Sequence, residues 1–147
     1  MERLVVALAL VAVAVVAAAV VDRRRPAAPT QPQWTVPAQL DRADFPSPEV
    51  PWLVAVFTSA TCDSCQGTIG KAHVLASDQV VVMEAEVVTH AELHRRYAID
   101  AVPTTVIADV EGVVRASFVG PVTATDLWAA VAEAREPGST PEPDLGR

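Results

Sequence analysis

Several chemically informative residue types are scarce in this 147-residue chain, which has two cysteines, one lysine and six glycines. The glycines form no phosphate-cradling motif and no serine stands in a nucleophile-elbow pattern, so nothing indicates a nucleotide site or a hydrolase. Neither cysteine lies near the apolar N-terminal segment, which excludes a lipoprotein anchor there. Acidic residues outnumber basic ones by 18 to 11, giving a net charge of −7. Because such a surface repels phosphate backbones, we expect no nucleic-acid partner.

Both cysteines belong to one motif, Cys62-Asp63-Ser64-Cys65. It follows an apolar run over residues 52–57, typical of a buried strand, and opens a helix predicted over residues 62–76. Unpaired N–H groups and the dipole at a helix start favour an anion, and such sites lower a thiol pKa from about 8.5 toward roughly 3.5–7.5. Cys65 lies three residues on, on the same helix face, and can attack a mixed disulfide formed at Cys62. This is the layout of a dithiol–disulfide exchange site.

A second informative feature is Pro103, which opens a β-branched run over residues 104–109. Proline cannot donate an N–H to a strand ladder, and it pushes Val102 toward extended geometry. A proline at a tight turn into a strand is often cis.

Together these features resemble the thioredoxin family over about residues 53–134. The match consists of a strand ending at residues 57–61, the cysteine motif, residues 97–99 leading into Val102-Pro103-Thr104, a turn at residues 111–112, and Gly120. The resemblance implies an α/β fold of thioredoxin-like, three-layer type, with a central mixed sheet and helices on both faces.

The resemblance also implies roles for individual residues. Cys62 would be the exposed nucleophile and Cys65 the resolving thiol, with no cofactor beyond their redox-active disulfide. Pro103 would be cis and lie beside the pair. Val102 would pair through its backbone with an extended substrate segment, and Thr61 would contact the same segment. The expected partners are protein disulfides and either a reductase or a membrane electron donor.

Three positions depart from the family pattern. Thr61 replaces a tryptophan before the first cysteine, Asp63-Ser64 replaces Gly-Pro, and Val56 stands where the family carries a buried acid. We expect Asp63 and Ser64 to tune the site. The charge of Asp63 opposes a thiolate at Cys62, which favours a reductant.

Other interpretations of the motif stay open. The two cysteines with His90 and His94 supply four zinc ligands, but their spacing matches compact fingers poorly, so we expect no metal. The cysteines also fit inert buried thiols, or a non-catalytic docking or redox-sensing module. We expect His94 on a solvated helix face, and both Trp52 and Trp128 in the core.

The chain divides into four parts. Residues 1–21 are predicted to be a transmembrane anchor, residues 22–50 a proline-rich tether whose part 38–45 adds a short helix or edge strand, residues 51–135 the thioredoxin-like domain, and residues 136–147 a disordered tail. Besides the cysteine helix, the expected elements are strands at 53–58, 80–87, after Pro103 and at 113–119, and helices at 91–97 and 124–134, the last capped by Thr123.

The N-terminal segment has eighteen uncharged residues, 4–21, which span about 27 Å as a helix. It fits a single-pass membrane anchor in a lipid bilayer better than a cleaved signal peptide. Arg23, Arg24 and Arg25 follow it, and the positive-inside rule then places the domain in the cytoplasm, with the extracytoplasmic side as the alternative. Ten arginines against one lysine indicate a bacterial source. We expect a monomer.

Overall fold

The structure is a computed structural model and describes residues 34–141 and Gly146. In chain order its elements are a 3-10 helix, four strands and three α-helices: η1 (Arg42–Asp44), β1 (Trp52–Thr58), α2 (Asp63–His73), β2 (Val80–Glu86), α3 (Ala91–Arg96), β3 (Thr104–Ala108), β4 (Val114–Val119) and α4 (Ala124–Arg135). The expected membrane anchor lies outside the described residues. None of the helices in the described part is long and apolar enough to cross a membrane.

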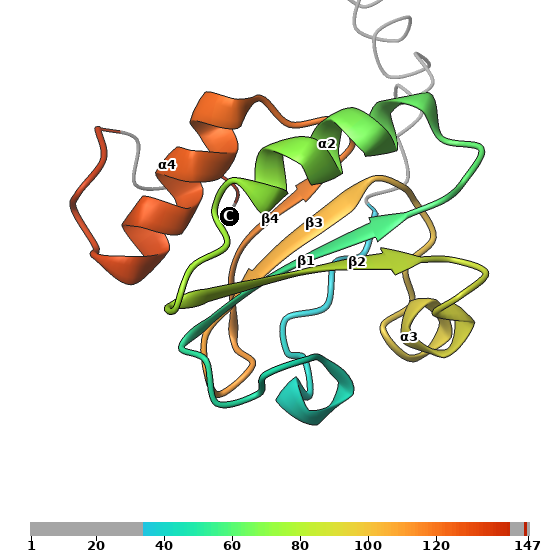
Figure 1. Cartoon of the computed structure of the whole chain (residues 1–147), viewed down its shortest axis with the longest axis horizontal. Coiled ribbons are helices and arrows are strands. Elements are labelled where there is room, and N and C mark those ends of the chain that lie inside the picture. The colour runs from blue at the N-terminus through green and yellow to red at the C-terminus, as the bar shows by residue number, and fades with distance from the viewer. Residues whose placement is uncertain (1–33, 142–145, 147) are drawn as a thin grey trace, which may run out of the picture. The chain divides into compact units, whose positions relative to one another are not determined.

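The four strands form one mixed sheet in the order β2-β1-β3-β4. β1 and β2 are parallel because α2 carries the chain back between them, whereas β3 and β4 form an antiparallel hairpin. Gly112 closes that hairpin at a φ of 81°, where a Cβ would lie 2.0 Å from the Leu40 carbonyl oxygen. The expected α/β fold with a mixed sheet and helices on both faces is confirmed (Figure 1).

β1 is buried on both faces, so its side chains divide between two cores. Val54 and Val56 pack with α2 and α4 on one face, and Leu53 and Phe57 pack with Tyr97 beyond α3 on the other. Figure 1 shows α2 and α4 above the sheet and α3 below it. Because successive side chains along a strand point to opposite faces, neighbouring residues of β1 face different cores.

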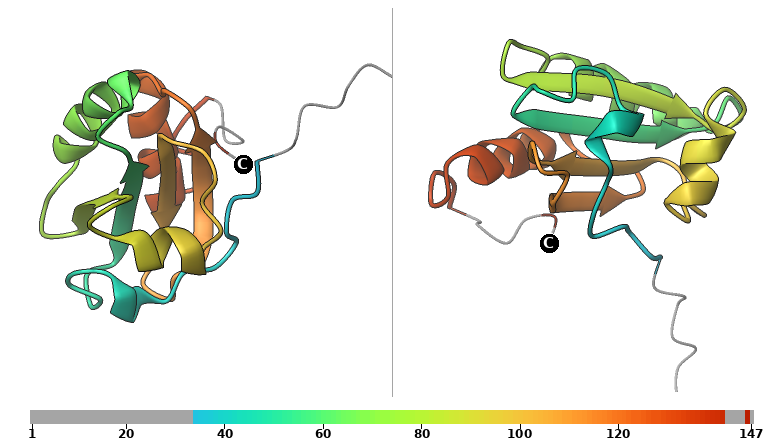
Figure 2. Two further views of the ribbon diagram at one scale, coloured as in Figure 1. Left: turned by 90° about the vertical axis from the view of Figure 1, so that its right-hand side faces the viewer. Right: turned by 90° about the horizontal axis from the view of Figure 1, so that it is seen from below.

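The segment before β1 differs in part from the expected tether. Leu40 and Phe45 are buried in the α3-side core, and η1 provides the short helix expected within residues 38–45. The backbone of Leu40 donates to the Gly112 carbonyl, and Val114 donates to the carbonyl of Ala38. Figure 2 shows this segment running beside β4. The folded unit therefore begins well before residue 51.

The start of the expected disordered tail is also held in place. The carboxylate of Glu133, on α4, accepts hydrogen bonds from the backbone N–H groups of Gly138 and Thr140 and from the Thr140 hydroxyl. Glu133 is only 5 % exposed, and a buried carboxylate requires such donors. Residues 142–145 and 147 lie outside the described part.

Two side-chain expectations were wrong. His94 is buried rather than solvated, because its Nε2 bonds the Ala85 carbonyl oxygen at 2.7 Å and its ring meets Phe57 edge-on. Trp128 is 42 % exposed rather than core, and its indole N–H donates to the Lys71 carbonyl on α2. Trp52 is half-buried against the α2-side core.

Candidate active site

The cysteine motif lies at the end of the loop that joins β1 to α2. The helix begins at Asp63, one residue later than expected, and Cys62 is its N-cap residue with extended backbone angles. No side chain caps this end, so the first N–H groups of α2, next to Cys62 in the chain, have no side-chain acceptor. The site is therefore built on a rigid strand end and a helix start.

The two cysteines form a disulfide but differ in access. Cys62 is partly exposed, whereas Cys65 is fully buried at 0 %. A substrate disulfide can approach the sulfur of Cys62, whereas the buried Cys65 can attack only the neighbouring Cys62 sulfur of a mixed disulfide. The asymmetry fits an attacking thiol and a resolving thiol.

The other residues predicted for the site divide between the surface and the interior. Thr61, Asp63 and Ser64 are exposed. The Ser64 hydroxyl lies 3.6 Å from the Cys62 sulfur, so a residue expected to tune the site contacts its reacting atom. Thr61 turns instead toward Ser59, with 3.1 Å between their hydroxyl oxygens.

Pro103 reaches the same end of the sheet. The Val102–Pro103 peptide bond is cis, as the sequence resemblance implies. β1 pairs with β3 through Phe57 and Thr104, so continuing this register brings Pro103 opposite Thr58, four residues before Cys62. Pro103 is buried, and Val102 before it is half-buried.

Sequence reasoning missed Glu86, at the end of β2. Its carboxylate accepts hydrogen bonds from the backbone N–H groups of Val88 and Thr89, both at 2.9 Å. The pKa of Glu86 is lowered, chiefly by the Thr89 N–H; partial desolvation opposes this, and the Val88 N–H, the Thr89 hydroxyl and the Ala60 N–H add to it. Glu86 thus links two loops, one of which leads into Cys62. An acid before Val-Val-Thr gives no local signal of this role.

We expect Glu86→Gln to weaken the acid dependence of stability. A carboxyl with a lowered folded pKa contributes stability that is complete above its unfolded pKa, and the contribution is lost as the pH falls through the folded pKa. Urea unfolding at about pH 7 and about pH 3 should show a smaller acid loss for the variant than for the wild type. The matched change Glu111→Gln, at an exposed acid in the β3–β4 turn, should keep the wild-type acid loss. An unchanged acid loss in Glu86→Gln would contradict this role.

Three of the four side chains considered as zinc ligands have other partners. The cysteine sulfurs bond each other, and the Nε2 of His94 bonds a backbone carbonyl oxygen. Among the described residues, no three His, Cys, Asp or Glu side chains lie close enough together to hold one metal ion.

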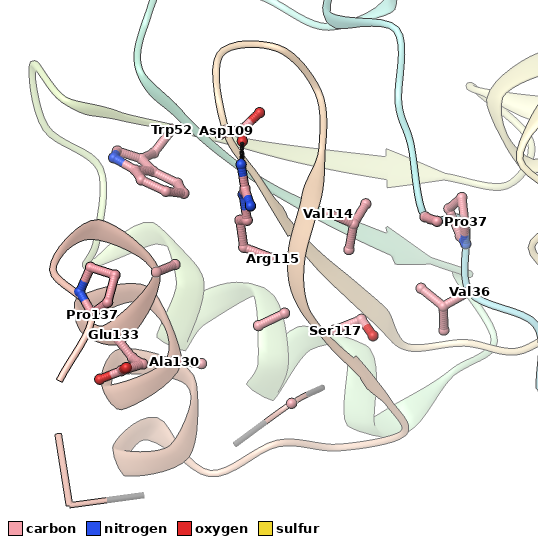
Figure 3. Close-up of a pocket in the computed structure, with 14 residues that line it drawn as sticks. Val36, Pro37, Trp52, Asp109, Val114, Arg115, Ser117, Ala130, Glu133 and Pro137 are labelled. Atoms are coloured by element: carbon pink, nitrogen blue, oxygen red, sulfur yellow. Dashed lines mark hydrogen bonds and ion pairs between the residues drawn. The ribbon is translucent and has the colours of Figure 1, made fainter. Parts of the chain in front are cut away.

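A cavity of about 830 Å³ lies away from the cysteines. Figure 3 shows it between β4 and α4, beside Trp52 at the start of β1 and the Arg115–Asp109 ion pair. Cys62 follows the opposite end of β1, about 20 Å along the strand. The cavity is therefore not part of the site.

Comparison with known proteins supports the fold. No family model and no curated protein matches the chain. Among solved structures, a mutant thioredoxin from Halobacterium salinarum matches at a TM-score of 0.57 and 20 % identity, over 74 % of this chain and 97 % of that one. The germline-specific thioredoxin Deadhead of the fly Drosophila melanogaster matches at 0.52 and 26 %, over 59 % and 84 %. A Fasciola hepatica thioredoxin matches at 0.51 and 23 %, over 58 % and 82 %. The chain has the thioredoxin fold, with a Cys-x-x-Cys disulfide at the start of α2.

Proposed function

We propose that this protein is a thiol–disulfide oxidoreductase that exchanges disulfides with protein substrates through Cys62 and Cys65. The observation that carries the proposal is the access asymmetry of the disulfide, with Cys62 partly exposed and Cys65 buried at the start of α2. The thioredoxin fold alone would not support an activity, because one fold serves many functions.

The reaction starts from the reduced pair. The thiolate of Cys62, favoured by the N–H groups and dipole of α2, attacks one sulfur of a substrate disulfide. A mixed disulfide forms, and the other substrate sulfur leaves with the electron pair. Cys65 then attacks the Cys62 sulfur, so the Cys62–Cys65 bond forms and the second substrate sulfur leaves. The substrate gains two electrons and two protons that the cysteine pair loses.

The substrate would meet the protein along the Val102–Pro103 turn. Val102 is half-buried beside the end of β1, and an extended chain can pair with the backbone of such a residue as a short added strand. Thr61, exposed on the other flank of Cys62, would border the same chain.

Insulin reduction tests the proposed activity. With dithiothreitol as the electron source, the 147-residue chain should accelerate precipitation of the insulin B chain. The variant Cys62→Ser/Cys65→Ser should leave the uncatalysed rate unchanged. If the wild type gives no acceleration over this variant, the chain is a non-catalytic module instead.

We further propose that residues 4–21 tether the domain to a membrane, with the domain in the cytoplasm. The support is the uncharged apolar run and the three arginines that follow it. A thioredoxin-reductase system would then recharge the cysteine pair, whereas on the outer side a membrane electron donor would be needed.

Labelling of a single cysteine tests the side of the membrane. The cysteine is placed by Ser139→Cys in the tail of a Cys62→Ser/Cys65→Ser background and is treated with a membrane-impermeant maleimide. We expect no labelling in intact cells and full labelling once the membrane is opened. Labelling in intact cells would place the domain outside.

A further inference from the structure

β2 lies at one edge of the sheet, and no strand of the described residues pairs with its outer side (Figure 1). The carbonyl of Gln79, just before β2, accepts from the Trp52 N–H. The N–H of Val87, just after β2, donates to the Thr58 carbonyl. Odd-numbered residues of β2 therefore bond to β1. Because neighbouring residues of a strand direct their backbone groups to opposite sides, the even-numbered residues point theirs outward.

Both ends of this outer edge are occupied by the chain itself. The N–H of Val80 donates to the Ser77 carbonyl, and the N–H of Ser77 donates back to the Val80 carbonyl. At the other end, the Glu86 carbonyl accepts from the His90 N–H at 2.7 Å. A strand that pairs along the whole length of β2 would meet these segments, so only the middle of the edge is open.

The open middle is the outer backbone of Val82–Glu84, which we call the β2 window. The N–H and carbonyl groups of Val82 and Glu84 that point outward have no partner among the described residues. The side chains of residues 81–84 are only half-buried, although Val82 packs against the α2-side core and Met83 against the α3-side core. An unpaired edge with apolar side chains on both faces is a template for a further strand.

A second copy of this chain does not fit the β2 window. In a two-fold antiparallel pairing centred on Met83, Glu86 of the second copy would lie beside Val80, where Ser77 already pairs. A pairing centred on Glu84 would place two Glu84 carboxylates directly opposite each other, and like charges in that position are destabilising. The window therefore suits a shorter, separate segment.

The charge of Glu84 selects the chemistry of that segment. Its Oε1 accepts a hydrogen bond from the Thr58 hydroxyl at 2.8 Å, and no Lys or Arg side chain among the described residues pairs with it. A carboxylate on an edge strand repels an acidic residue placed opposite and favours a basic one. The next residue, Met83, points to the other face of the sheet, where an apolar neighbour would extend the α3-side core.

We propose that the β2 window binds an extended, basic segment of a partner protein as an added strand. In antiparallel orientation the segment exchanges two hydrogen bonds with Val82 and two with Glu84. A lysine or arginine of the segment then lies opposite Glu84, and an apolar residue lies opposite Met83. The main-chain bonds supply affinity and the two side-chain positions supply specificity. The proposal does not depend on the chemistry of the cysteine pair.

Hydrogen exchange of single amides, followed by NMR on the full chain in detergent micelles, tests the proposal. In the free chain, the amides of Val82 and Glu84 should exchange at least about tenfold faster than those of Val81 and Met83, which bond to β1. The probe is the peptide acetyl-Arg-Val-Arg-Val-Val-amide. At millimolar concentration it should slow exchange at Val82 and Glu84 by about fivefold or more. The same peptide N-methylated at its central arginine keeps the charge, cannot pair as a strand, and should slow neither amide.

Glu84→Gln tests the charge. The variant keeps an acceptor for the Thr58 hydroxyl and should weaken binding of the peptide by about two- to fivefold. Glu111→Gln, at an exposed acid in the β3–β4 turn, is the matched control and should bind like the wild type. Equal binding by Glu84→Gln and the wild type would overturn the assignment of a basic segment.

Other results would overturn the β2 window itself. If Val82 and Glu84 exchange slowly in the free chain at every protein concentration, a segment of the same chain covers the edge. If their protection rises with protein concentration, a second copy covers it. Equal slowing by the N-methylated peptide would show attraction by charge without an added strand, and no slowing by either peptide would show that the window binds no such segment.

Discussion

Cys62→Ser should abolish insulin reduction, lowering the catalysed rate by about a hundredfold or more. The partly exposed sulfur is the atom that a substrate can reach, and Cys65 is fully buried, so no other thiol can start the reaction. Cys65→Ser should also stop turnover, because the adduct at Cys62 is no longer resolved. Thermal unfolding of both variants in the presence of reductant should match that of the reduced wild type. Substantial turnover by Cys62→Ser would contradict the assignment of the nucleophile.

Arg42→Met should destabilise the fold by about 3 kcal/mol, the largest effect expected from a residue outside the cysteine motif. Arg42 is 6 % exposed, and its guanidinium donates to the backbone carbonyls of Val50, Asp109 and Ser47. Burial lowers its pKa, and the charges of Asp109 and Glu49 partly oppose this. Removing the donors leaves three carbonyls without this partner.

Arg96→Met is the matched control for Arg42→Met. Arg96 pairs with Asp41 and Asp44, but its side chain is 53 % exposed, and exposed ion pairs contribute less than about 1 kcal/mol. Urea unfolding gives both free energies. If Arg42→Met costs as little as Arg96→Met, the segment before β1 is not part of the folded domain.

The elements with local signals were predictable from the sequence. Three local features predicted the elements at which they lie: the apolar run of β1 predicted a strand, the glycine of the β3–β4 turn a hairpin, and the threonine before α4 a helix start. Thr123 accepts a hydrogen bond from the Asp126 N–H at 3.1 Å, as its N-cap position predicted. The predicted ends of helices were less accurate, since α2 ends at His73 and the prediction extended to residue 76.

Features that depend on pairing between distant segments were not predictable from the sequence. The sequence around His94, with two arginines beside it, indicates a solvated position. Only the Ala85 carbonyl on β2, which accepts a hydrogen bond from its Nε2, gives the buried ring a partner. In the sequence, nothing distinguishes Glu84 from Glu86, the other acid of the same strand. Its relation to Val56 and Thr58 depends on the β1–β2 register, which a single sequence does not specify.

Val56 is the apolar residue at the position where the thioredoxin family carries a buried acid. Val56 itself carries no proton acceptor, but its strand neighbours Glu84 and Thr105 bring polar groups to the same level of the sheet. The departure at one position is thus accompanied by polar side chains on both adjacent strands.

The most direct measurement of the central claim is the mass of adducts formed with a protein disulfide. The reduced Cys65→Ser and Cys62→Ser chains are each mixed with insulin, quenched with acid and analysed by intact mass spectrometry. The account predicts a stable insulin adduct on Cys65→Ser, linked through Cys62, and almost none on Cys62→Ser, whose remaining thiol is buried. Equal adducts on both variants, or no adduct on Cys65→Ser, would contradict it.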